Sequence, residues 1–79
     1  MSAPIATFDA IAEHVAQVLQ VPKEQLRPEV LISELGTDSL DLVEMAIDLQ
    51  EEFDVIITQE EFARIRTLGE LQSLVLGRQ

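Results

Sequence analysis

Apolar residues recur at the spacing of an α-helix in separate stretches of this chain, and this periodicity sets the class of fold. In the first stretch, residues 7–19, they follow an i, i+3, i+4, i+7 pattern, which places them on one side of a helix. The stripe consists of Phe8, Ile11, Ala12, Val15 and Leu19. Thr7 is expected to cap this helix, because a threonine oxygen can accept from a free first-turn amide. We therefore expect the stripe to be core.

The absence of cysteine in a chain of 79 residues narrows the fold further. Neither a disulfide framework nor a thiolate zinc site can be built. Helices packed against near neighbours in the sequence are then the simplest way to close a small core. Hydrophobic residues make up 47% of the chain, enough for collapse despite a net charge of −10. We predict a single all-α domain spanning residues 1–79.

A second helix is predicted over residues 39–53, with its side chains divided into three arcs by an advance of about 100° per residue. The first arc is the predicted core face and contains Leu42, Met45, Ala46, Leu49 and Phe53. The opposite arc is acidic and contains Asp41, Glu44, Asp48, Glu51 and Glu52. The third arc is apolar and lies on one flank of the acids: Leu40, Val43 and Ile47. Geometry alone leaves open whether this third arc widens the core face or stays exposed as a contact strip.

A long connection, residues 20–38, separates these two helices. Pro22 and Pro28 prevent a continuous helix, although residues 23–26 could form a single turn. Gly36 is expected to supply the turn that leads into the second helix.

Two further helices are predicted towards the C-terminus. Thr58 and Glu61 have the spacing of a capping box, which would open a brief helix through Ile65. Thr67 would begin the last helix, and Gly77 would end it. Its buried face would consist of Leu68, Leu71, Leu74 and Val75. The expected fold is a small four-helix bundle of three longer helices and one short helix, with a long loop between helices one and two.

Charge is concentrated in the middle of the chain. Eleven of the 15 acidic residues lie between Pro28 and Ala63, where no lysine or arginine occurs. Such a surface repels phosphates and excludes nucleic acid as a partner. Composition alone favours a solvated face, and the alternative is a docking surface for basic partners. No apolar run approaches the roughly 20 residues that span a bilayer, and no secretory signal is visible, so we expect a cytoplasmic protein without membrane insertion.

Ser39 stands where the irregular connection becomes the second helix. Free amides and the positive end of the helix dipole would favour a phosphate attached to it. Either Asp38 or Ser39 could cap the helix. The only histidine, His14, lies on the first helix, off its apolar stripe, and is expected to be an ordinary, partly exposed surface residue. A Ser-His-Asp hydrolase needs a histidine beside its serine, so we interpret Ser39 as an attachment point and expect no enzymatic activity.

Metal binding receives no support from the carboxylates around Ser39. Asp38, Asp41 and Glu44 are spaced by three, so they follow one helix face and cannot wrap around a calcium ion. We therefore predict no metal site.

The sequence around Ser39 strongly resembles acyl carrier proteins. The resemblance rests on Leu35-Gly36-x-Asp38-Ser39-Leu40 followed by Asp41-x-Val43-Glu44-x-x-x-x-Leu49-x-Glu51-Glu52-Phe53. It implies that Ser39 carries 4′-phosphopantetheine through a phosphodiester, installed from coenzyme A by a separate phosphopantetheinyl transferase. The thiol of that arm would hold acyl groups as thioesters, and Asp38 would support the modification.

The same resemblance implies a partner-binding face on the second helix. Its residues would be Leu40, Asp41, Val43, Glu44, Ile47, Asp48 and Glu51. The partners would be the transferase and enzymes that synthesise or transfer acyl chains and carry basic docking patches, and we expect a monomer. This shifts our interpretation of the third, apolar arc from core to contact strip.

Several positions depart from carriers of fatty acid synthesis: Leu42, Asp48, Gln50, Thr58, Arg64 and Arg66. They leave open whether the pathway is fatty acid synthesis or a dedicated polyketide, aminoacyl or peptidyl pathway. The acidic second helix argues against a peptide-pathway carrier. From a different class, the alternative is a small acidic helical protein that masks a basic surface and never acquires a prosthetic group.

Overall fold

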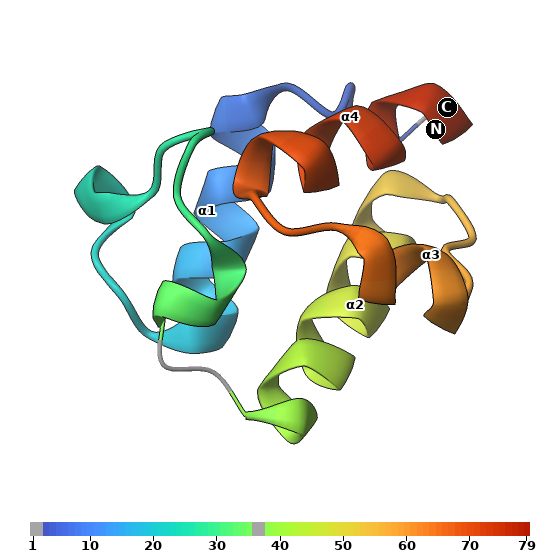
Figure 1. The fold of residues 1–79 in the computed structure, drawn as a ribbon. Helices are drawn as coiled ribbons and strands as arrows, with labels where there is room; N and C mark the ends of the chain where they lie inside the picture. The colour runs from blue at the N-terminus through green and yellow to red at the C-terminus, as the bar shows by residue number, and fades with distance from the viewer. Residues whose placement is uncertain (1–2, 36–37) are drawn as a thin grey trace.

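The computed structural model describes residues 3–35 and 38–79, which form a bundle of four α-helices (Figure 1). The helices are α1 (Phe8–Leu19), α2 (Ser39–Phe53), α3 (Gln59–Arg64) and α4 (Leu68–Arg78). Two short 3-10 helices, η1 (Lys23–Gln25) and η2 (Ile32–Leu35), lie in the long connection between α1 and α2. The predicted all-α fold is confirmed. None of the helices in the described residues is both long and apolar enough to cross a membrane.

The beginnings of the helices follow the predicted caps. Thr7 Oγ1 accepts from the amide of Ala10 at 3.1 Å, so α1 begins at the residue after Thr7. Thr67 caps α4 in the same way through the amide of Glu70. Each cap satisfies a first-turn amide that has no partner inside its own helix. The predicted starts of both helices are therefore confirmed by their hydrogen bonds.

The core lies where α1, α2 and α4 meet. Its largest fully buried side chains are Phe53, Ile11, Met45, Leu49, Leu68, Leu71, Val15 and Val75. All eight come from those three helices, and each contributes about 1.5–3 kcal/mol through burial. The helix α3 contributes only half-buried side chains, such as Phe62. The three long helices thus supply the largest core side chains, as their apolar stripes predicted, although Leu42 and Leu74 of the predicted faces are only partly buried. Residues outside these helices complete the buried core: Ala6, Leu26, Ile32, Val55 and Ile57.

The end of α4 differs from the prediction. Gly77 was expected to end this helix, yet α4 continues through it to Arg78. A glycine ends a helix when the chain needs a left-handed residue, and Gly77 does not adopt that conformation. Left-handed residues do close α1 and α2, but they are Gln20 and Asp54.

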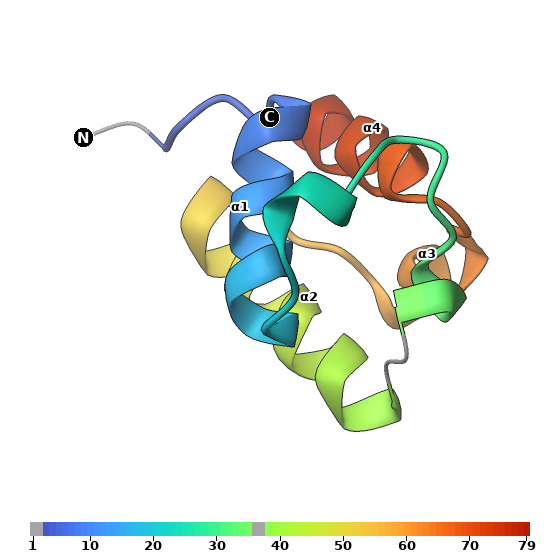
Figure 2. The same cartoon turned by 90° about the vertical axis from the view of Figure 1, so that its left-hand side faces the viewer.

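The long connection is held against the start of α4. The amides of Leu68 and Gly69 donate to the carbonyls of Val30 and Pro28, at 3.1 and 2.9 Å. The amide of Ile32 donates to Arg66 O at 2.8 Å. Figure 2 shows the connection rising along α1 to the start of α4 and then descending towards α2. The free first-turn amides of α4 thereby fix the segment that leads into η2, and this segment in turn precedes α2.

Two predictions for this connection have different outcomes. The turn predicted over residues 23–26 is present as η1. The turn expected at Gly36 lies outside the described residues, so it stays a prediction.

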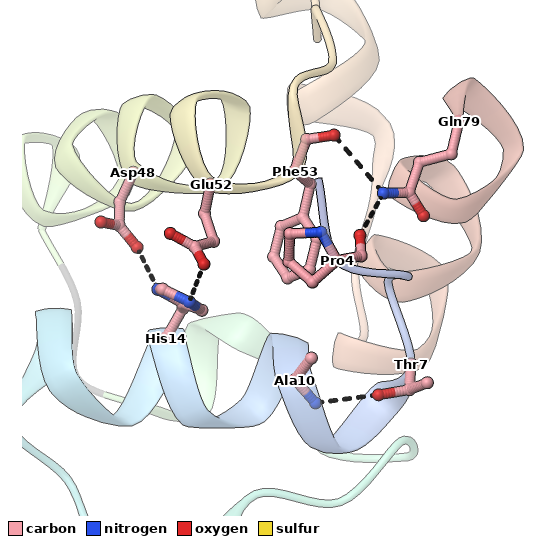
Figure 3. A network of polar contacts seen from close by, with 8 residues as sticks. All are labelled: Pro4, Thr7, Ala10, His14, Asp48, Glu52, Phe53 and Gln79. Carbon is pink, nitrogen blue, oxygen red and sulfur yellow. Dashed lines mark hydrogen bonds and ion pairs between the residues drawn. The ribbon is translucent and has the colours of Figure 1, made fainter. Parts of the chain in front are cut away.

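The segment before α1 is also fixed by side-chain hydrogen bonds. Gln79 Oε1 accepts from the amide of Ala6 at 2.8 Å. Gln79 Nε2 donates to Pro4 O at 2.6 Å and to Phe53 O at 3.4 Å (Figure 3). Gln72 Nε2 donates to Ala6 O at 2.9 Å. Ala6 is fully buried as a result. This end of the bundle therefore joins residues 4–6, the end of α2 and α4.

The contact between Gly69 and Pro28 gives a stability prediction. A Cβ at position 69 would lie 3.0 Å from Pro28 O, the atom that accepts the Gly69 amide, so it could not be accommodated without weakening that bond. We expect Gly69→Ala to lower the free energy of unfolding by about 1 kcal/mol. Gly77→Ala is the control, because nothing lies within 4 Å of its Cβ position. It should raise stability by about 0.5 kcal/mol through helix propensity. Urea denaturation of both variants measures this, and a gain at both positions would contradict it.

Candidate functional site

Asp38 and Asp41 define the start of α2 through reciprocal hydrogen bonds. Asp38 Oδ1 accepts from the amide of Asp41 at 2.8 Å, and Asp41 Oδ2 accepts from the amide of Asp38 at 3.4 Å. The cap is therefore Asp38, which settles the alternative that the sequence left open. Ser39 becomes the first helical residue and is exposed. Since the cap does not use the Ser39 hydroxyl, this hydroxyl is available to a reagent from outside.

The surroundings of Ser39 favour an attached phosphate over a nucleophilic serine. The amides of the first turn and the positive end of the α2 dipole lie beside it. The only histidine of the chain contacts Asp48, nine residues further along α2 and thus about 13.5 Å from Ser39 along the helix. His14 is therefore too far away to activate Ser39 directly. Within the described residues, no three potential ligands gather into a metal site.

The third, apolar arc of α2 is exposed. The exposed fractions are 64% for Leu40, 52% for Val43 and 49% for Ile47. Met45 and Leu49, on the predicted core face, are fully buried. The core does not extend onto the third arc, which remains a strip of apolar side chains on the surface; we call Leu40, Val43 and Ile47 the apolar ridge.

The acids of α2 do not share one environment. Glu44 and Glu51 are exposed, and Asp41 takes part in the cap. Asp48 Oδ2 lies 2.8 Å from His14 Nδ1 on α1, and Glu52 Oε1 lies 3.6 Å from His14 Nε2 (Figure 3). The acidic arc predicted opposite the core thus borders α1 along one of its edges.

His14 is partly exposed, as the sequence predicted, but it is more than an ordinary surface residue. Its side chain is 22% exposed, and its ring meets Phe53 edge-on with centroids 5.6 Å apart. This contact with α2 was not predicted from the sequence. The i, i+4 spacing of Asp48 and Glu52 could have indicated that both face one point on a neighbouring helix.

Two departures from the family pattern have structural roles. Gln50 Oε1 accepts from the amide of Ile57 at 2.9 Å, and its Nε2 donates to Ala46 O, so this side chain holds the loop after α2. Thr58 forms the predicted capping box with Glu61 and opens α3, which ends at Arg64 with Ile65 as its C-cap. Glu61 also pairs with Arg78 at the end of α4.

Comparison with known proteins agrees with this geometry. The family described as "Phosphopantetheine attachment site" matches residues 9–75, a range that includes Ser39 and all of α2. An acyl carrier protein from Wolinella succinogenes is 40% identical over 68 residues, covering 85% of this chain and 90% of that protein. The chain belongs to the acyl carrier protein family.

Membership confirms the predicted family, the acyl carrier role and the prosthetic group, 4′-phosphopantetheine. The family consists of carriers, which work with synthases and transferases and are modified by a phosphopantetheinyl transferase. The residues of this carrier fit the group, because an exposed serine hydroxyl, not used by the cap, stands at the start of a helix.

The assignment of the cap to Asp38 can be tested by stability. We expect Asp38→Ala to lower the free energy of unfolding by about 1 kcal/mol, since the amide of Asp41 loses its acceptor. Ser39→Ala should change it by less than about 0.5 kcal/mol, because the hydroxyl is exposed and not part of the cap. Thermal and urea denaturation measure both. A larger loss for Ser39→Ala than for Asp38→Ala would move the cap to Ser39.

Proposed function

We propose that this chain carries acyl groups as thioesters on a 4′-phosphopantetheine arm attached to Ser39 Oγ, and that it delivers them to partner enzymes. The observation that carries the proposal is the cap. Because Asp38 satisfies the first turn of α2, Ser39 keeps an exposed hydroxyl at the positive end of the helix. The arm supplies the thiol that holds the acyl group, and this chain supplies the attachment point and the docking surface.

Each residue at the start of α2 has a proposed role in the modification. A transferase forms the phosphodiester at Ser39 while the pyrophosphate bond of coenzyme A breaks, adenosine 3′,5′-bisphosphate leaves, and the hydroxyl proton passes to the transferase. The first-turn amides and the dipole favour the phosphate that results. Asp38 uses Oδ1 in the cap, and its Oδ2 is proposed to help the transferase and its metal approach.

The apolar ridge and the neighbouring carboxylates form the proposed docking face. The ridge is exposed apolar surface, Glu44 and Glu51 adjoin it, and Asp41 adds negative charge at the start of the helix. Asp48, the other acid expected on this face, faces His14 of α1 instead. Such a face fits enzymes that combine an apolar pocket with a basic patch. We also propose that the chain is a single domain, that it is monomeric and has no catalytic activity, and that it acts in the cytoplasm.

For the pathway, we propose fatty acid or related acyl-chain biosynthesis. The alternative is a dedicated polyketide, aminoacyl or peptidyl pathway. Arg64 and Arg66 are exposed beside the end of α3, which keeps that alternative in consideration.

Labelling tests the attachment. The apo-protein, incubated with coenzyme A, Mg²⁺ and a broad-specificity phosphopantetheinyl transferase, should gain one phosphopantetheine by intact mass. Ser39→Ala should gain none and keep its helical circular dichroism. Ser73→Ala, at an exposed serine of α4, is the matched control and should be labelled like the wild type. Labelling of Ser39→Ala would refute the assignment of the site.

Ile47 tests whether the ridge binds partners. Because Ile47 is half exposed, Ile47→Ala should cost less than about 1 kcal/mol of folding stability. It should weaken transferase binding by about 1–2 kcal/mol if the side chain enters an apolar pocket. Met45→Ala, at a fully buried position of the same helix, should instead cost about 2–5 kcal/mol of stability. Thermal melts and transferase kinetics separate these effects, and unchanged kinetics for Ile47→Ala would contradict the docking role.

A further inference from the structure

His14 lies between two carboxylates of α2. Its Nδ1 is 2.8 Å from Asp48 Oδ2, and its Nε2 is 3.6 Å from Glu52 Oε1 (Figure 3). The side chains of these two acids are 41% and 45% exposed, while that of His14 is 22% exposed. In residues 3–35 and 38–79, these are the two contacts between an imidazole or a basic group and a carboxylate that join α1 to α2.

The two contacts make use of both ring nitrogens. Nδ1 is at hydrogen-bond distance from Asp48, whereas Glu52 faces Nε2 from just beyond that distance. The edge of the ring packs against Phe53, which is itself buried in the core. The ring is therefore held by packing as well as by its polar contacts, which reduces the side-chain entropy that those contacts must overcome.

Helix geometry separates the acids of α2 into two pairs. Glu44 and Glu51 are about 20° apart around the axis and adjoin the apolar ridge. Asp48 and Glu52 are about 40° apart and adjoin α1, as their contacts with His14 confirm. The mean directions of the two pairs differ by about 70°. A partner that covers the ridge thus approaches the first pair more closely than the second.

We propose that the acids of α2 have two separate tasks: Asp48 and Glu52 form a clamp with His14 that holds α1 to α2, while Glu44 and Glu51 present the charge that basic partners bind. This division rests on the proposed function for its docking half only. The docking half fits a partner enzyme that has an apolar pocket flanked by basic groups. These basic groups would match the carboxylates of Glu44 and Glu51, which are about 10.5 Å apart along the helix. His14 acts as a positioning residue that removes Asp48 from the docking face.

The clamp also explains how an acidic helix can pack closely against α1. Eleven acids with no lysine or arginine among them repel one another in the middle of the chain. His14 places an imidazole ring where α1 and α2 meet, and two of those acids face its nitrogens. The most crowded edge of α2 is thereby bound to its neighbour.

Two matched double variants test the division, since each removes two carboxylates by near-isosteric replacement. Asp48→Asn/Glu52→Gln should lower the melting temperature by about 4–8 °C and leave the kcat/KM of transferase labelling within about twofold of wild type. Glu44→Gln/Glu51→Gln should keep or raise the melting temperature and lower kcat/KM by about 5–20-fold at low salt. High salt should shrink that second difference.

A double-mutant cycle with His14→Leu tests whether the effect of Asp48 and Glu52 on stability depends on His14. Leucine keeps an apolar contact with Phe53 but donates no hydrogen bond. In the His14→Leu background, Asp48→Asn/Glu52→Gln should shift the melting temperature by less than about 2 °C, because the partner of both acids is already gone.

Three results would overturn the proposal. One is equal loss of labelling for the two double variants. Another is a melting temperature that does not fall in Asp48→Asn/Glu52→Gln. The third is a fall of the same size in the His14→Leu background. If wild-type protein is not labelled at all, the proposed function fails, while the melting temperatures still decide whether the clamp exists.

Discussion

The reciprocal hydrogen bonds between Asp38 and Asp41 are the interaction on which the functional reading of this structure depends. They end the long connection and start α2 at a defined residue. If Ser39 were the cap, its hydroxyl would accept a hydrogen bond from the helix and would be directed into the first turn. With Asp38 in that position, the serine keeps the dipole and the free amides as neighbours while its oxygen remains open to a transferase. The cap therefore both starts α2 and leaves the Ser39 hydroxyl exposed for the proposed attachment.

Burial and charge are separated around the axis of α2. The face towards α1 and α4 buries Met45, Leu49 and Phe53 completely, and this burial holds a strongly acidic helix in the bundle. The remaining circumference is exposed in some places and contacts α1 through His14 in others. A carrier that passes from one enzyme to another needs a surface that binds each of them briefly, and in the proposed docking face screened charge next to a narrow apolar ridge would provide that.

Much of the fold could be predicted because local chemistry determines it. Thr7, Thr58 and Thr67 mark helix starts by a bond to an amide three residues on, so their positions are visible in the sequence. The buried faces followed from helical spacing in the same way. The prediction that Gly77 ends α4 was wrong because a glycine permits a helix to end but does not require it to end. No contact around Gly77 requires the helix to end there. The pairing of His14 with Asp48 and the approach of Pro28 to Gly69 depend on which helices meet, which no local pattern reports. At the site, Ser39 could be located from its motif, whereas the exposure of the ridge required the packed structure.

The most direct test of the central claim is peptide mapping by mass spectrometry of the protein purified from the cells that make it. We predict a single phosphopantetheine, free or acylated, on the peptide that contains Ser39, and the mass of any acyl group would identify the cargo. A phosphopantetheine on another residue would contradict the account. So would a chain that stays unmodified in cells whose other carrier proteins bear the arm.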